Sequence, residues 1–282
     1  MKSKVEKILG RHFPEQAWRI TRPRSGLQKE AYIVQSERHK LFLKFDADTP
    51  AWQRLAEIGA APPLIGTGVY DRRPYVIQRF MEGEHPDRRW FTQNITLLAE
   101  FIHRYQTDRP LKEILTTSPG QSYAEHVWRE VGTLESALNR TGSRRFNSDR
   151  FRQGFSLFRE QARQLEAVPL MPVHADPSPG NFLVTKHGIT MLDWDEVLLS
   201  DPMRDVGPVV WWYLPQDRWQ AFFDLYGAPL DRSRIFWWAA RRSVEIALWF
   251  DEREANDAAR TFLDDFYLTV QHQENPQVAS YA

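Results

Sequence analysis

Two carboxylates and an amide are the residues of this 282-residue chain whose types and spacing suggest chemistry. Asp176 and Asn181 stand at the two ends of the loop DPSPGN, which two prolines stiffen. Asp193 follows twelve residues after Asn181, beyond the runs FLVT and ITML, and Gly188 between these runs suits the tight turn of a hairpin. Because a tight hairpin brings its ends together, we expect Asp193 beside Asn181. The three side chains would then offer oxygen atoms to one small volume.

Such a set of oxygen atoms predicts a magnesium site that serves phosphoryl transfer. Oxygen ligands without thiolates or clustered histidines suit Mg²⁺, and the chain has no cysteine. Lys44, in the strand-like run LFLKF, is the candidate cation for the phosphates that the metal would carry. In phosphoryl transfer the protein positions two reactants and neutralises charge on the transferred group. One Asp then accepts the proton of the acceptor hydroxyl, while an Asp and an Asn hold the metal.

The same residues carry a resemblance to a known family. VHADPSPGNFLV followed by MLDWDEVLLSDPMRDVG resembles the aminoglycoside phosphotransferase and choline kinase-like family, a branch of the protein-kinase-like fold. The family pattern is His-x-Asp-x-x-x-x-Asn, then apolar-Asp-Trp, then Asp-Pro-x-x-Asp, and this chain matches it in order and at close to the usual spacing. A weaker resemblance extends over the remaining chain, through LFLKF, YVIQRFMEGE and LAEFIHRYQ.

The resemblance implies a role for each matching position of the catalytic segment. Asp176 is implied as the catalytic base that receives the acceptor's hydroxyl. Asn181 and Asp193 are implied as the ligands of Mg²⁺. His174 and Asp205 are implied to brace the catalytic loop without touching substrate.

The resemblance also implies a nucleotide site, for ATP or GTP, in the first part of the chain. Its residues are the phosphate-binding Lys44, the phosphate loop at Ser25 and Gly26, and the purine-binding backbone of Arg79, Phe80 and Met81. The phosphate loop departs from the pattern because it has one glycine where relatives often have two, so Ser25 and Gly26 equally fit a plain turn. The acid that should pair with Lys44 is not obvious either, and Asp48 and Glu57 both stay open.

The acceptor is the least readable part of the prediction. Acidic residues near the end of the chain suggest a hydroxylated amine such as an amino sugar or amino alcohol, with Asp195, Glu245 and Asp251 as candidate acceptor-binding residues. A solvated acidic surface explains most of these acids equally well. Aromatic residues gather in the same third of the chain, and most should be core, although a few would line an acceptor pocket: Trp211, Trp212, Tyr213, Trp219, Phe222, Phe223, Trp237, Trp238 and Trp249.

The elements that must position these residues predict an α+β, two-lobed protein-kinase-like fold. Two β-rich runs, 31–34 and 40–45, form a hairpin, a short helix capped by Thr49 follows, and 75–80 is a further strand. From residue 91 the pattern becomes helical and is interrupted by the hairpin that follows the catalytic loop. We therefore expect a small nucleotide-binding lobe over residues 1–82, with the hinge at its end, and a large helical lobe over residues 83–282.

Composition places limits on partners and location. Lys plus Arg and Asp plus Glu each number 37, so nothing in the net charge asks for nucleic acid or a membrane surface. The chain shows no apolar run of membrane-spanning length and no signal peptide, so a cytoplasmic monomer or homodimer is expected.

The leading hypothesis is a small-molecule kinase that uses ATP or GTP with Mg²⁺ and a small acceptor with a free hydroxyl. A catalytically silent nucleotide-binding protein on the same fold is the first alternative. It is motivated by the phosphate loop, which has only one glycine, and by the lack of an obvious helix Glu to pair with Lys44. A metal-dependent phosphoesterase is the second and weaker one, because such sites usually draw on several histidines, and those of this chain are scattered.

Overall fold

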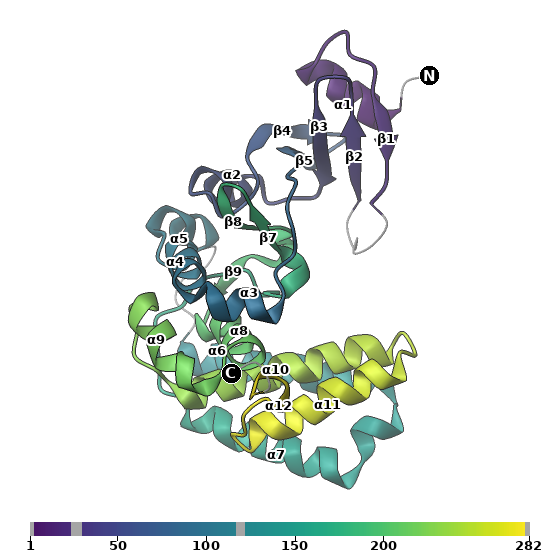
Figure 1. Cartoon of the computed structure of the whole chain (residues 1–282). Coiled ribbons are helices and arrows are strands. Elements are labelled where there is room, and N and C mark those ends of the chain that lie inside the picture. Colours follow the sequence, from purple (N-terminus) through teal and green to yellow (C-terminus); the bar gives the residue numbers. More distant parts are fainter. Residues whose placement is uncertain (1–2, 24–29, 117–121, 280–282) are drawn as a thin grey trace.

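The structure, a computed structural model, describes residues 3–23, 30–116 and 122–279. A strand-rich part holds the N-terminus and a larger helical part holds the C-terminus, with a single extended segment leading from β5 to α3 (Figure 1). This arrangement confirms the predicted α+β, two-lobed fold class. In the described part of the chain, no helix is long and apolar enough to cross a membrane.

The small lobe is an antiparallel five-stranded sheet of order β1-β2-β3-β5-β4 with two helices. Helix α1 (Lys4–His12) packs Val5, Ile8 and Leu9 against one face of the sheet. Alternation of apolar and polar residues forms the strands, because it gives each strand one side to bury. The predicted hairpin is confirmed. The strands are β1 (Arg19–Thr21), β2 (Ala31–Gln35), β3 (Lys40–Phe45), β4 (Leu64–Tyr70) and β5 (Arg73–Arg79).

Helix α2 (Thr49–Glu57) follows β3 and faces the other lobe. Its N-cap is Asp48, whose carboxylate accepts a hydrogen bond of 3.5 Å from the Ala51 N–H. The prediction that Thr49 caps this helix was wrong, because Thr49 is already its first helical residue. Pro50 lies in the first turn as expected, where the missing N–H of proline has no helical partner to lose.

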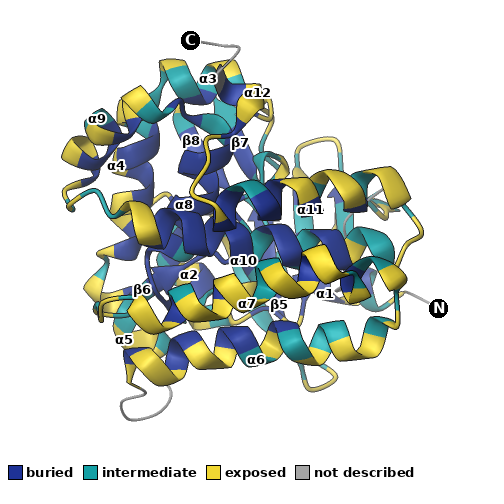
Figure 2. Ribbon diagram, turned by 90° about the horizontal axis from the view of Figure 1, so that it is seen from below, coloured by how far each residue is buried: buried dark blue, intermediate teal, exposed yellow. Residues whose placement is uncertain are grey.

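The large lobe is built from helices around a buried pair. Figure 2 shows α8 (Met203–Tyr213) and α10 (Arg232–Asp251) dark with burial in the middle, while α6 (Tyr123–Thr141) and α7 (Asp149–Gln164) expose one face. Most of the late aromatic residues are core as predicted, among them the fully buried Trp219, Trp237 and Trp238. The other helices are α3 (Arg88–Gln93), α4 (Ile95–Gln106), α5 (Arg109–Leu115), α9 (Gln216–Tyr226), α11 (Asn256–Val270) and α12 (Pro276–Ala279).

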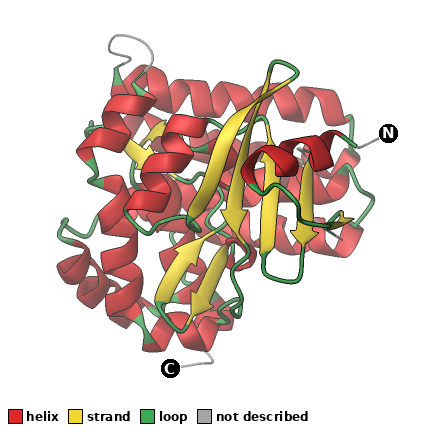
Figure 3. Cartoon of the chain, turned by 90° about the horizontal axis from the view of Figure 1, so that it is seen from above, coloured by secondary structure: helices red, strands yellow, loops and turns green. Residues whose placement is uncertain are grey.

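Two short two-stranded antiparallel sheets carry the catalytic segment within this lobe. Strand β6 (Met171–Val173) pairs with β9 (Leu198–Ser200), and β7 (Phe182–Thr185) pairs with β8 (Gly188–Met191). Gly188 has φ of 120°, so the predicted positive φ at this turn is confirmed. The β7–β8 hairpin lies beside the larger sheet (Figure 3), and the Met191 N–H at its end donates to the Ala60 carbonyl of the small lobe.

The two lobes share one hydrophobic core on the side of α2. Trp52 and Leu55 of α2 belong to the same buried cluster as Phe182 and Met191 of the large lobe. The Ala60 carbonyl accepts hydrogen bonds from the Met191 N–H (2.9 Å) and the Thr190 hydroxyl (3.1 Å). These contacts fix the position of β3 and α2 relative to the β7–β8 hairpin. The boundary at residue 82 remains a prediction.

Candidate active site

Lys44 lies at the junction of the lobes. It is near the end of β3, and its side chain is 3% exposed. Its Nζ is 2.5 Å from Asp193 Oδ1 and 2.7 Å from Asp195 Oδ2, both in the large lobe. The indole of Trp52 on α2 lies beneath the ammonium at 5.5 Å. A buried ammonium is stable only with such partners, so the structure ties the small lobe to the segment after β8.

The two acids left open as partners of Lys44 serve other purposes. Asp48 caps α2, and Glu57 lies at the exposed end of that helix, where it pairs with Arg54 at 3.1 Å. Among the described residues, neither acid forms an ion pair with Lys44, so both alternatives were wrong for this structure. Helix α2 instead presents Trp52 to the lysine, and the acids come from the opposite lobe.

The catalytic loop is braced by a buried aspartate. Asp205 accepts hydrogen bonds from the N–H groups of His174 (2.7 Å) and Ala175 (2.9 Å) and from the Tyr105 hydroxyl (2.8 Å). Burial raises the pKa of the Asp205 carboxyl, although these hydrogen bonds oppose the shift. Ala175 adopts φ of 71°, a strained conformation that the hydrogen bonds to Asp205 stabilise.

His174 ties the loop to the segment that carries Asp193. Its Nε2 is 2.7 Å from the Leu192 carbonyl, and its Nδ1 accepts a hydrogen bond of 3.2 Å from the Asp176 N–H. Since a carbonyl only accepts, the partners assign the proton to Nε2. The ring is fully buried, so it positions Asp176 and Asp193 without access to a ligand.

Asp176, Asn181 and Asp193 are brought together as the spacing predicts. The Asn181 amide donates from Nδ2 to the Asp176 carboxylate (3.0 Å) and the Asp176 carbonyl (2.9 Å). The Leu192 N–H donates to the Asn181 carbonyl at 2.7 Å, which sets Asp193 beside Asn181. Asp193 itself takes the left-handed conformation, with φ of 60°.

The donor set fits a magnesium ion. The Asn181 amide nitrogen is engaged with Asp176, which directs its Oδ1 elsewhere, and the Asp193 carboxylate is half-exposed. Amide and carboxylate oxygens are the ligands that Mg²⁺ prefers, with waters and phosphates completing the shell. Within the described residues, no three His, Asp or Glu side chains form a ready-made metal cage.

Arg242 on α10 is the residue of this site that sequence analysis missed. Its guanidinium forms an ion pair with Asp176 and a hydrogen bond of 2.5 Å with Glu245. Burial opposes its charge, but Glu245 and Asp176 outweigh burial and raise the pKa of Arg242. Arg242 therefore stays charged and orients the carboxylate of Asp176.

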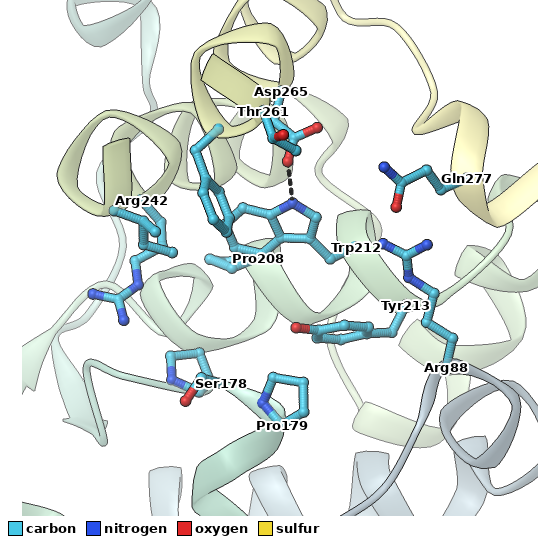
Figure 4. Close-up of a pocket in the computed structure, with 13 residues that line it drawn as sticks. Arg88, Ser178, Pro179, Pro208, Trp212, Tyr213, Arg242, Thr261, Asp265 and Gln277 are labelled. Atoms are coloured by element: carbon cyan, nitrogen blue, oxygen red, sulfur yellow. Dashed lines mark hydrogen bonds between the residues drawn. The ribbon is translucent and has the colours of Figure 1, made fainter. Parts of the chain in front are cut away.

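A cavity of about 300 Å³ opens next to Asp176. Pro177, Ser178 and Pro179 form its floor, and the rings of Trp212 and Tyr213 from α8 stand in its middle (Figure 4). The other residues along its wall are Arg88, Pro208, Arg242, Ile246, Thr261, Phe262, Asp265 and Gln277. Its size is at the lower end of the range for small-molecule sites, about 300–1,000 Å³.

Asp265 is the buried carboxylate of this cavity. It accepts a hydrogen bond of 2.9 Å from the Trp212 indole N–H, drawn in Figure 4. Burial raises the pKa of Asp265 to about 6, although the indole N–H and the nearby Arg88 oppose the shift.

The acids predicted to bind the acceptor lie elsewhere. Burial opposes ionisation of Glu245, but Arg241 and Arg242 lower its pKa below the usual range and hold its carboxylate. Asp251 is bound by Arg145 and by the Thr141 hydroxyl (3.2 Å) at the end of α10. Asp195 pairs with Lys44. None of the three is among the described residues that line the cavity.

The predicted purine-binding segment follows β5. The Arg79 N–H donates to the Pro63 carbonyl (2.9 Å) and the Phe80 N–H to the Lys40 carbonyl (3.1 Å), so both donors are used within the fold. The Met81 N–H makes no hydrogen bond with the described part of the chain. Ser25 and Gly26 lie outside the described residues.

One signal for Arg242 was present in the sequence. Two arginines interrupt the apolar run IFWWAARRSVEIALWF, and a buried helix tolerates charge only where partners exist. Arg241 pairs with Glu130 (2.8 Å) and Glu245 (2.7 Å), and Arg242 reaches Asp176 from 66 positions away. The sequence alone does not identify such distant partners.

The chain is similar in fold to several solved kinases. It matches aminoglycoside phosphotransferase APH(4)-Ia, as a thermostable mutant in a complex with ADP and hygromycin B, with a TM-score of 0.69 and 14% identity over 96% of this chain and 99% of that one. It matches choline kinase LicA from Streptococcus pneumoniae with a TM-score of 0.66 and 16% identity over 99% and 100% of the chains. Choline kinase from Cryptosporidium parvum gives a TM-score of 0.66 and 14% identity over 95% and 94%.

A family comparison covers most of the sequence. The profile of the phosphotransferase enzyme family matches residues 16–242, a span that includes Lys44, the catalytic loop, Asp193 and Arg242. The resemblance found in the sequence motifs is thereby confirmed. The chain belongs to the phosphotransferase enzyme family.

Proposed function

We propose that this phosphotransferase is a small-molecule kinase that transfers the γ-phosphate of ATP or GTP, with Mg²⁺, to the hydroxyl of a small acceptor. The observation that carries the proposal is the contact of Lys44 with Asp193 across the lobes, beside the Asp176–Asn181 pair. A cation, two carboxylates and an amide thus lie together, and the residues that follow Asp176 line a cavity that suits a small molecule.

Asp176 is the group that accepts the acceptor's proton. The residues that follow it form the cavity floor, and its carboxylate is 37% exposed, so an acceptor hydroxyl reaches it from the cavity. Arg242 and Asn181 each hold one carboxylate oxygen, which orients the base before the acceptor arrives. Tyr105 and Asp205 hold the loop from behind.

Asn181 and Asp193 are the residues that would hold Mg²⁺, which supplies positive charge against the transferred phosphate when bound. Lys44 carries the second positive charge. Lys44 contacts Asp193 and Asp195, and at this junction of the lobes it would also meet an incoming phosphate. The Met81 N–H, which makes no hydrogen bond with the described residues, is the donor expected to meet the purine.

A release assay for ADP and GDP against a broad panel of hydroxyl compounds tests this function. The wild-type protein is expected to release nucleoside diphosphate only with Mg²⁺ and an acceptor, and to yield a phosphorylated product by mass spectrometry. Asp176→Asn should reduce transfer by about a thousandfold while keeping nucleotide affinity. Asp217→Asn, an exposed acid on α9, is the matched control and should match the wild type.

The same assay separates the rival functions. Nucleotide binding without transfer to any member of the panel would favour a catalytically silent protein and contradict the kinase. Hydrolysis of a simple phosphomonoester without nucleotide would favour a phosphoesterase instead.

A further inference from the structure

The cavity beside Asp176 has an arginine at each end. Figure 4 shows Arg242 and Arg88 on opposite sides, with the rings of Trp212 and Tyr213 between them. The lining also includes apolar residues, among them Pro208, Ile246 and Phe262, and the polar residues Ser178, Thr261, Asp265 and Gln277. A ligand that fills this space meets a charged group at each end and a flat apolar passage in the middle.

The end of the cavity at Arg242 lies beside Asp176, the proposed catalytic base. The Arg242 guanidinium is engaged by Asp176 and by Glu245, so its charge is already neutralised by the protein. The acceptor hydroxyl must lie at this end, because Asp176 is here. The recognition of the remaining part of the acceptor therefore falls to the opposite end of the cavity.

At that opposite end lies Arg88, whose charge also acts on the nearby Asp265 carboxylate. It is the first residue of α3 and half-buried, and within the described chain its guanidinium makes no hydrogen bond or ion pair. A half-buried guanidinium beside apolar walls favours an anion, and its planar pair of N–H donors matches a carboxylate.

Asp265 does not reverse this preference. It is the one acid among the described residues that line the cavity, and its carboxylate already accepts from the Trp212 indole. Burial raises its pKa to about 6, so the cavity stabilises its charged form less well than water does. The charge of Arg242 is already neutralised, and Asp265 is engaged by the indole, so the guanidinium of Arg88 makes the cavity a poor site for a cationic amine.

We propose that the acceptor is a small hydroxy acid, whose carboxylate binds Arg88 while its hydroxyl faces Asp176 across a flat apolar body. This replaces the amino alcohol suggested by the acidic composition of the last third of the chain. The inference rests on the proposed kinase function for the role of the hydroxyl, but the recognition of the carboxylate by Arg88 is a binding property of its own.

Three probes of one shape test the proposal: 4-(hydroxymethyl)benzoate, 4-(hydroxymethyl)benzamide and 4-(hydroxymethyl)benzylamine. Their affinities are measured by calorimetry, and their Mg²⁺- and nucleotide-dependent phosphorylation by mass spectrometry. The full chain should bind the benzoate about tenfold or more tightly than the amide or the amine. Arg88→Ala should abolish that preference without changing affinity for the amide, and Arg88→Lys should restore part of it.

Arg89→Ala is the matched control, because Arg89 is the exposed neighbour of Arg88 on the same helix, and it should bind all three probes as the wild type does. Equal nucleotide affinity in every variant verifies that the fold is intact. Tighter binding of the amine, a benzoate preference that survives Arg88→Ala, or no benzoate binding at all would each overturn the proposal. Phosphorylation of the amine but not the benzoate would overturn it while supporting the kinase. Arg88-dependent benzoate binding without transfer to any hydroxyl compound would support the carboxylate site and count against the kinase.

Discussion

At the scale of single residues, Lys44 is the group on which both lobes depend. Its ammonium lies between Asp193 and Asp195 with almost no exposure. It neutralises these two carboxylates and is the cation proposed to bind a phosphate. Because its ammonium contacts Asp193, it competes with a metal for that carboxylate. Its removal therefore has opposite effects on metal binding and on catalysis.

Lys44→Met should reduce phosphate transfer by about a hundredfold or more, because charge on the transferred group is no longer neutralised. The same change should increase the thermal stabilisation by MgCl₂ alone, because two carboxylates lose their internal cation. Thermal unfolding with and without MgCl₂ measures the second effect, with Lys186→Met on an exposed turn as control. Weaker stabilisation by Mg²⁺ in the Lys44 variant would contradict this role.

Arg242 acts on the reaction through Asp176. Arg242→Met should lower kcat by about 10- to 100-fold and change the nucleotide KM little, because Arg242 contacts the base and lies away from Lys44. Steady-state kinetics measure both constants, and Arg253→Met at the far end of the same helical segment is the control. A Lys substitution should recover part of kcat. A rise in nucleotide KM with unchanged kcat would refute the positioning role.

At the scale of elements, α2 and α10 show what the sequence could and could not predict. The hairpin of β2 and β3, the helix after it and the turn at Gly188 follow from local patterns, and the structure confirms them. The catalytic loop was also predictable, because its residues lie close together in the sequence. These features depend on residues that are close in the sequence, so the sequence alone is enough to predict them.

Partners that come from distant elements were not predictable. Asp48 and Glu57 were both left open as partners of Lys44, one just before the next helix and one within it, but the structure supplies Asp193 and Asp195 from 149 and more positions away. Arg88 and Asp265 likewise meet only in the folded cavity. Sequence patterns indicate which side chains are buried on a helix, but they do not indicate what each one meets.

A substitution of Asp48 distinguishes its role as the N-cap of α2 from a role as the partner of Lys44. Asp48→Ala should lower the free energy of unfolding by about 0.5–1 kcal/mol, since one N-cap hydrogen bond is lost, and leave nucleotide affinity unchanged. Urea unfolding and nucleotide titration measure the two quantities. Glu57→Gln should change neither, because Glu57 is exposed and pairs only along its helix. A large loss of nucleotide affinity in the Asp48 variant would restore Asp48 as the partner of Lys44.

At the scale of the whole molecule, the core ties catalysis to stability. One buried cluster runs from Trp52 and Leu55 of the small lobe to α8 and α10 of the large lobe, so the lobes do not bury separate cores on this side. Trp212 of this cluster also lines the cavity. The buried carboxyl of Asp265 in the same cavity makes the stability of the fold depend on pH.

Burial raises the pKa of Asp265 from near 4 in the unfolded chain to about 6 in the fold. The folded state therefore holds the proton more tightly, so the contribution of Asp265 to stability falls as the pH rises through 6. Asp265→Asn removes this titration and keeps an acceptor for the Trp212 indole. The stability of the variant relative to wild type should grow by about 1.4 kcal/mol between pH 5 and pH 8. Urea unfolding across this range measures it, and a constant difference would show that Asp265 is not buried as described.

The most direct test of the account is the pairing of nucleotide affinity with phosphate transfer in Asp176→Asn. The account predicts that this variant binds ATP or GTP with Mg²⁺ as the wild-type protein does, and that transfer to an acceptor found for the wild type falls by about a thousandfold. A variant that transfers phosphate at the wild-type rate would contradict the account, because the carboxylate that Arg242 and Asn181 orient would then have no part in the reaction.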